Sequence, residues 1–158
     1  MNATWIVSAN ASRARFFSQM QTEDHLEEVN DMINDAVRQR MLEASETDKL
    51  GPTSATKSMH NTGGATPNKL YEPAQTPDQH QAELFARDII NYLLQSHREG
   101  RFQQLSLVVS PKFLGMLRSL MPAELESVVS MELNKDYTQF SGDQLLEQIK
   151  GQVAKKSS

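Results

Sequence analysis

The chain has 158 residues, a mass of 17.8 kDa and a formal net charge of −4, which is the size of one domain. It contains no cysteine, so disulfides and thiolate chemistry are excluded. The apolar run after Met1 lacks the basic start of a signal peptide and is far shorter than the roughly 20 residues that cross a bilayer. The composition therefore predicts a cytoplasmic protein without membrane insertion. The negative charge argues against indiscriminate nucleic-acid binding but allows a local basic patch.

The first part of the chain predicts three strands and a helix. Residues 4–20 favour a β-hairpin with its turn at 10–13, and residues 25–30 favour a third strand. Apolar residues at helical spacing over 33–44 predict a short amphipathic helix that covers the sheet and frays toward Asp48.

A long basic loop is predicted at 49–75. Between Lys49 and Tyr71 the sequence has no acidic residue, and Lys57 and Lys69 lie among Gly, Pro, Ser, Thr and Asn. A structureless connection longer than about 15 residues is uncommon in a compact domain unless it is functional or disordered. The loop is therefore either a binding element or a tolerated, solvated insertion.

A long helix is predicted directly after this loop. Thr76 has the chemistry of an N-cap, Pro77 suits the first helical position, and Gln79 completes a capping box. An apolar stripe runs over 82–93, and Gly100 gives the helix a conventional end.

The remaining sequence alternates strand and helix patterns. The predicted order is a strand buried on both faces at 105–109, a helix at 110–121, a strand at 129–133 and a helix at 141–153. Strands first, then strands alternating with helices, predict one α/β domain with a mixed sheet flanked by helices.

We expect this single domain to occupy residues 1–154. A disordered tail is predicted for residues 155–158.

Four ordered segments carry a family resemblance, at 5–17, 71–87, 107–118 and 133–138. Together they resemble the host attachment proteins, which belong among the bacterial relatives of the archaeo-eukaryotic peptide-chain release factors. The resemblance implies a ribonuclease H-like domain in which a Gly-Gly-Gln loop precedes a long helix. Here that stretch is Gly63-Gly64-Ala65, so the glutamine expected to position water at a peptidyl-tRNA ester is missing. Peptide release by that mechanism is therefore not expected.

Five residues outside the loop have side chains suited to a binding surface. Arg13 and Arg15 alternate on a predicted strand, where they would either grip phosphate or guard a sheet edge with charge. His80, Glu83 and Arg87 lie along one side of the long helix. No second metal ligand occurs at a convincing spacing from His80, so neither a metal site nor a cofactor is predicted.

The sequence thus favours a non-catalytic domain that binds a translation-related RNA or ribonucleoprotein surface, with the ribosome or tRNA as partner. One alternative is a host-attachment factor that acts indirectly on surface interactions. Another is a hydrolase of ester or phosphoester bonds, with His80 or Glu83 as base. The oligomeric state is left open. The candidate nucleic-acid-binding residues are Arg13, Arg15, Lys57, Gly63, Gly64, Lys69, His80 and Arg87.

Overall fold

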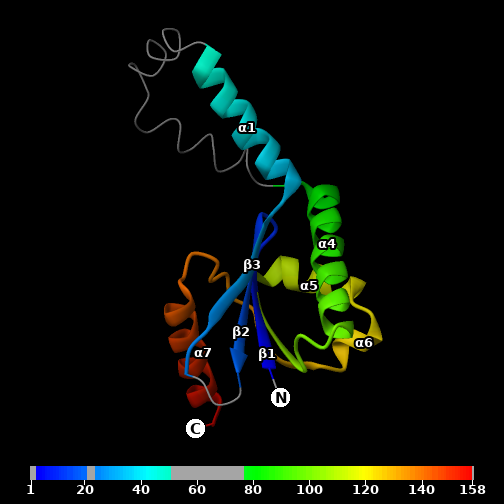
Figure 1. Cartoon of the computed structure of the whole chain (residues 1–158), viewed down its shortest axis with the longest axis vertical. Coiled ribbons are helices and arrows are strands. Elements are labelled where there is room, and N and C mark those ends of the chain that lie inside the picture. The colour runs from blue at the N-terminus through cyan, green and yellow to red at the C-terminus, as the bar shows by residue number, and fades with distance from the viewer. Residues whose placement is uncertain (1–2, 21–23, 51–76, 158) are drawn as a thin grey trace.

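The computed structural model describes residues 3–20, 24–50 and 77–157. It is one α/β domain in which a five-stranded mixed sheet lies between helices (Figure 1). This confirms the predicted fold class. Four of the candidate residues lie outside the described residues, namely Lys57, Gly63, Gly64 and Lys69.

The sheet has the order β3-β2-β1-β4-β5. Its strands are β1 (Ala3–Ala9), β2 (Arg13–Met20), β3 (Glu27–Ile33), β4 (Gln104–Val109) and β5 (Val129–Leu133). Strands β1, β2 and β3 pair antiparallel, which confirms the predicted hairpin, whereas β4 runs parallel to both β1 and β5. The third strand begins and ends later than predicted.

Helices cover both faces of this sheet (Figure 1). Helices α4 (Gln79–Arg98) and α5 (Pro111–Leu120) pack on one face, followed by the short α6 (Ala123–Glu126). Helix α7 (Gly142–Ser157) packs on the other face and extends over most of the predicted tail. None of the helices in the described residues has the length and apolar character needed to span a bilayer.

The two faces of β1 and β4 explain how the layers are held together. Alternate residues of β1 point to opposite faces, so that Trp5 joins the cluster under α4 and α5, while Ile6 joins the cluster under α7. Residues 105–109 of β4 are buried on both faces, as predicted. The apolar stripe predicted over 82–93 is confirmed, because Phe85, Ile89 and neighbouring residues of α4 are buried.

The helix predicted over 33–44 differs from the structure. Ile33 is the last residue of β3, and α1 (Asp35–Leu50) extends away from the sheet (Figure 1). Among its described side chains Val37 is buried, whereas Met41 is 49% exposed. The prediction that this helix covers the sheet is therefore wrong. Both faces of the sheet already have helices. Helix α1 also extends beyond the predicted range, to Leu50.

The predicted start of α4 is two residues too early. The N-cap is Asp78, whose carboxylate accepts from the Gln81 amide at 2.8 Å, while the Gln81 side chain accepts from the Asp78 amide at 3.0 Å. Both Thr76 and Asp78 have a glutamine three residues later, so the local pattern fits either position. The predicted end is confirmed, since Gly100 follows the helix with φ of 78°.

Candidate binding site at the ends of the parallel strands

Strands β1 and β4 end side by side. Ala9 and Val109 are paired in register, and the Ser110 amide donates to the Ala9 carbonyl at 3.1 Å. After Ala9 the chain turns back as a hairpin into β2, and after Val109 it enters α5. Ligands of α/β proteins bind preferentially outside the carboxyl ends of parallel strands. This end of the sheet is therefore the first place to look for a site.

A small crevice of about 260 Å³ lies at this end. We call it the strand-end crevice. Apolar groups and a few polar ones line it together, which is the usual composition of a small-ligand site. Its lining residues are Ala11, Pro77, Asp78, Gln79, Ala82, Ser110, Lys112, Phe113 and Met116.

The start of α5 gives one side of the crevice a positive character, opposite the carboxylate of Asp78 at the start of α4. Ser110 occupies the N-cap position, but its side chain makes no capping hydrogen bond, and Pro111 has no amide hydrogen. Lys112 is exposed beside it and makes no ion pair within the described residues, whereas Arg118 on the same helix pairs with Glu132. Free amides and a lysine at a helix start favour an anionic group. The start of α4 differs, because its capping box includes the carboxylate of Asp78.

Asn34 fixes the position of the crevice relative to the sheet. It is 3% exposed, and its amide nitrogen donates to the carbonyls of Ala11 at 2.9 Å and Gln81 at 3.3 Å. The hairpin turn and the first turn of α4 are thus tied through one buried side chain. Asn34 was not among the residues predicted from the sequence. Its only local signal was an amide residue immediately before the helix that begins at Asp35, a typical N-cap position.

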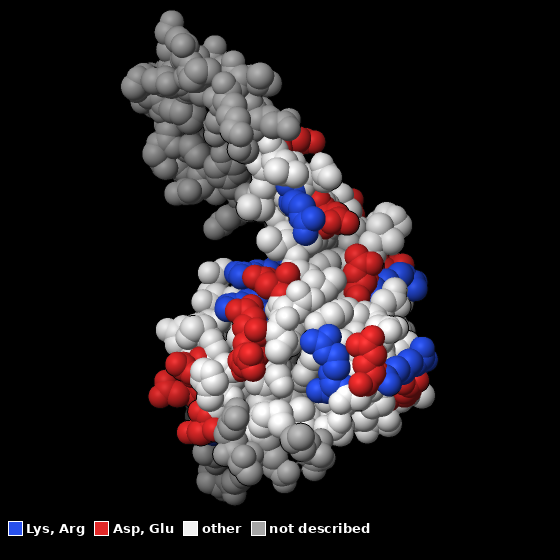
Figure 2. Space-filling model, in the orientation of Figure 1, with Lys and Arg blue, Asp and Glu red and all other residues white. Residues whose placement is uncertain are grey.

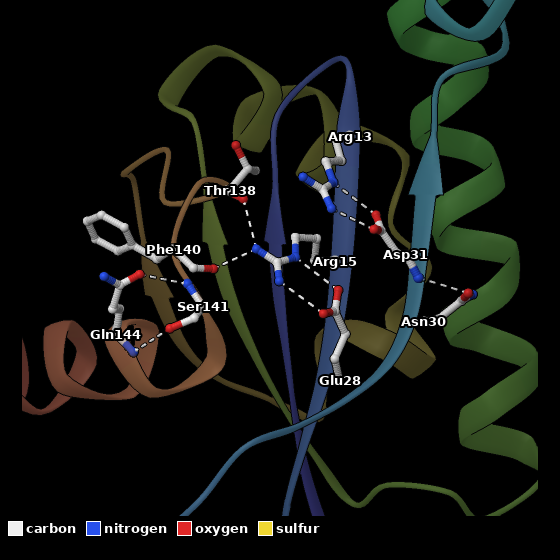
Figure 3. A network of polar contacts seen from close by, with 9 residues as sticks. All are labelled: Arg13, Arg15, Glu28, Asn30, Asp31, Thr138, Phe140, Ser141 and Gln144. Atoms are coloured by element: carbon white, nitrogen blue, oxygen red, sulfur yellow. Dashed lines mark hydrogen bonds and ion pairs between the residues drawn. The ribbon is translucent and has the colours of Figure 1, made fainter.

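Arg13 and Arg15 share one face of β2, as their alternation predicted, but they are held differently (Figure 3). Arg13 makes a two-point contact with Asp31, at 3.0 Å from Nε and 2.6 Å from Nη2, and both side chains are 39% exposed. The hydrogen bonds to Asp31 raise the pKa of the Arg13 guanidinium above its ordinary value. This pair links β2 to β3, which is the edge strand of the sheet.

The Arg15 side chain is only 13% exposed and has more partners. Its Nε and Nη2 each lie 2.9 Å from a Glu28 oxygen, and its Nη1 donates to the carbonyls of Thr138 at 3.0 Å and Phe140 at 2.6 Å (Figure 3). The side-chain amide of Asn10 adds a bond of 2.9 Å to Asp136 in the same loop. Arg15 therefore fastens the loop after β5 to the sheet, and its charge is balanced by Glu28.

The candidate residues of α4 are spread along the helix. His80 is exposed in the first turn and makes no hydrogen bond or ion pair within the described residues. Glu83 forms an ion pair of 3.2 Å with Arg87 on the helix surface. The structure thus brings Arg13 and Arg15 together, but it does not gather His80 and Arg87 into the same cluster. Neither His80 nor Glu83 is hydrogen-bonded to a hydroxyl group in the part of the chain that is described.

The described surface carries charges of both signs. On the face shown in Figure 2, lysine and arginine side chains lie next to aspartate and glutamate and do not gather into one basic area. Within the described ranges, no group of three or more His, Asp or Glu residues is arranged to hold a metal ion. The strand-end crevice, with Lys112 and the open start of α5, is the local arrangement best suited to a ligand.

The mixed sheet between helices, with a crevice where its parallel strands end, defines a single α/β domain. The chain belongs to the family of proteins required for attachment to host cells, because the family model matches residues 5–149. It is also 27% identical over 81 residues to an uncharacterized protein of Rickettsia prowazekii (strain Madrid E). That alignment covers 50% of this chain and 54% of the relative, so the chain spans about half the length of that protein.

Proposed function

We propose that this chain is a non-catalytic binding domain that acts in attachment to host cells, and that it meets its ligand at the strand-end crevice. The observation that carries the proposal is the meeting of the hairpin turn after β1 with the starts of α4 and α5 around this crevice, with Lys112 unpaired within the described residues. Most of the lining side chains belong to the two helices, which keeps the groups of a binding site in place.

The proposed ligand is a translation-related RNA or ribonucleoprotein surface. The resemblance to release-factor relatives supports this class, and a ribonuclease H-like fold remains part of the same proposal. A lysine beside the amides of an uncapped helix start suits a backbone phosphate. Pro77 lines the crevice and directly follows residues 51–76 in the sequence. In this proposal Lys57, Gly63, Gly64 and Lys69 of the basic loop, which lie outside the described residues, also contact the ligand.

The other candidate residues have different parts in this proposal. Arg15 positions the loop after β5 and does not touch the ligand, because its donors already have partners. Arg13, His80 and Arg87 are auxiliary contacts, since their side chains remain partly or largely exposed.

The test uses the full chain with purified ribosomes and with tRNA, titrated at several salt concentrations. Lys112→Glu is the test variant. Lys135→Glu is the matched control, because Lys135 is also exposed and has no ion pair within the described residues. We expect Lys112→Glu to weaken binding about tenfold at low salt and to reduce the slope of log affinity against log salt by about 1. The absence of binding at low salt, or equal weakening by the control, would show that the proposal is wrong.

The family description raises the question of where the protein acts. We propose an indirect role, in which a cytoplasmic protein changes the expression of surface components. Cell fractionation combined with an attachment assay distinguishes this indirect role from direct adhesion at the cell surface. A purely cytoplasmic pool, together with loss of attachment after gene deletion, supports the indirect role. Protein at the outer surface would instead indicate direct adhesion.

A further inference from the structure

The exposed large apolar side chains are confined to one part of the described structure. Met41 and Leu42 on α1 are 49% and 52% exposed, and Leu84 on α4 is 49% exposed. Single exposed apolar residues are ordinary on protein surfaces, but a group of them on adjoining elements indicates an interaction site.

A groove connects the two helices at this place. It has a volume of about 180 Å³ and lies between the start of α1 and the side of α4. Asp35, Leu84 and Asp88 are among its lining residues. Leu42 follows Asp35 by seven residues, which places both on the same face of α1. Leu42 therefore lies on the same side of α1 as the groove, two turns further along the helix, with the exposed Arg38 between them.

The described side chains of helix α1 pack sparsely on the rest of the domain. It has 16 residues and extends away from the sheet (Figure 1). Among the side chains described between Asp35 and Glu43, only Val37 is buried. Isolated helices of about 12–15 residues are marginal in water, and most helices in proteins depend on a packed apolar face. A further surface that covers α1 would supply this packing.

The charges beside the apolar groups are complementary to one another. Arg38 is exposed on α1, one turn before Leu42, and makes no ion pair within the described residues. Asp88 is exposed in the groove, one turn after Leu84, and it likewise lacks an ion pair in the described part of the chain. Each side of the proposed contact thus has a leucine with a charged residue four positions away. The two charges are opposite in sign.

We propose that this surface is where a second copy of the chain docks, with α1 of one copy lying across α4 of the other about a two-fold axis. Leu42 packs on Leu84 of the partner subunit, and Arg38 pairs with Asp88 of the partner subunit. The two-fold axis repeats each contact. Each chain therefore contributes Leu42 and Arg38 to one contact and Leu84 and Asp88 to the other. This self-complementarity favours a second copy over an unrelated protein.

The first experiment measures the oligomeric state of the full chain by sedimentation equilibrium. The wild type should form a dimer, and Leu84→Glu and Leu42→Glu should each weaken the dimer by about thirtyfold or more, because each places a charge in the apolar centre. Both positions are exposed in the single chain, so the variants should fold, which circular dichroism checks. A monomeric wild type, or a dimer unaffected by both variants, overturns the proposal.

The second experiment tests the charge pair. Arg38→Asp and Asp88→Arg should each weaken the dimer about tenfold, because each places like charges opposite one another twice. The double variant restores the pair in reversed order and should recover most of the wild-type affinity. Lys135→Asp is the matched control and should leave the dimer unchanged. Failure of the double variant to recover affinity shows that Arg38 and Asp88 do not meet, and the proposed docking is then wrong.

Discussion

The two faces of the sheet are stabilised in different ways. Under α4 and α5 lies a large apolar cluster that includes Trp5, Phe85 and Phe113. Under α7 the apolar cluster is much smaller, and beside it lies the polar network of Arg15. On the first face, stability comes mainly from close packing of apolar side chains. On the second face, hydrogen bonds between fixed partners contribute as well. Truncating a large buried side chain should therefore cost more stability on the first face than on the second.

The comparison also holds between two neighbouring arginines on β2. Arg13 and Arg15 each face one carboxylate, yet only Arg15 continues to two backbone carbonyls in a distant loop. The stability that each arginine contributes therefore depends on its partners and not on its residue type. The strand-end crevice depends on both faces, because α4 and α5 form it while the hairpin turn beside it is tied to the loop through Asn10.

The largest effect is expected on the face of α4 and α5. Phe85 is 3% exposed and its ring lies 6.0 Å from that of Phe113. Phe85→Ala should lower the free energy of unfolding by about 3–5 kcal/mol, because it leaves a cavity in the larger cluster. Leu145→Ala, under α7, should cost closer to about 2 kcal/mol, although Leu145 is fully buried. Urea unfolding measures both variants, and an equal or larger loss for Leu145→Ala would contradict the comparison.

The next effect separates the two arginines. Arg15→Met should lower the free energy of unfolding by about 2 kcal/mol, since it leaves Glu28 and the carbonyls of Thr138 and Phe140 without their donor. Arg13→Met is the matched control and should cost less than about 1 kcal/mol, because its pair with Asp31 is exposed. The same urea titration measures both variants. Equal losses would mean that the loop is not fastened through Arg15.

A smaller effect tests where α4 begins, at the edge of the strand-end crevice. Asp78→Ala should lower the free energy of unfolding by about 1 kcal/mol, because the Gln81 amide loses its capping partner. Thr76→Ala is the control and should leave stability unchanged, since Asp78 holds the N-cap position. Thermal or urea unfolding measures both variants. A larger loss of stability for Thr76→Ala than for Asp78→Ala would instead support the predicted N-cap at Thr76.

Periodic patterns made much of the fold predictable. The buried strand at 105–109 and the apolar stripe over 82–93 are local signals, and both are confirmed. The helix at 35–50 shows the limit of this reasoning, because apolar spacing says where a helix forms but not which surface it meets. The start of α4 shows another limit, since two capping patterns overlap in the sequence and the helix uses only the one at Asp78.

The candidate site was less predictable because its parts are distant in the sequence. The carbonyls that bind Arg15 lie 123 and 125 residues further along the chain. The strand-end crevice combines the hairpin turn with the starts of two helices, and no single segment carries its pattern. Arg13 and Arg15 were recognisable as arginines on one face, but the number of partners that each one has depends on tertiary structure.

The smallest effect concerns the far end of the α4 face, where α4 meets α6. Arg98 and, to a lesser extent, His97 hydrogen-bond to Glu124, at 3.1 Å from Arg98 Nη2 and 3.4 Å from His97 Nδ1. Mainly through the bond from Arg98, these contacts hold the pKa of Glu124 below the ordinary glutamate value of 4.5. A lowered pKa in the folded state adds stability above the unfolded value, and that stability is lost as pH falls through the folded value.

The expected result is a slightly steeper loss of stability below about pH 4.5 in the wild type than in Glu124→Gln, which cannot titrate. The difference should be small because the Glu124 side chain is 38% exposed. Urea unfolding at a series of acidic pH values measures it. Glu126→Gln on the same short helix is the control, since Glu126 has no ion pair within the described residues. If both variants change the acid dependence equally, general charge and not the contact between α4 and α6 is the cause.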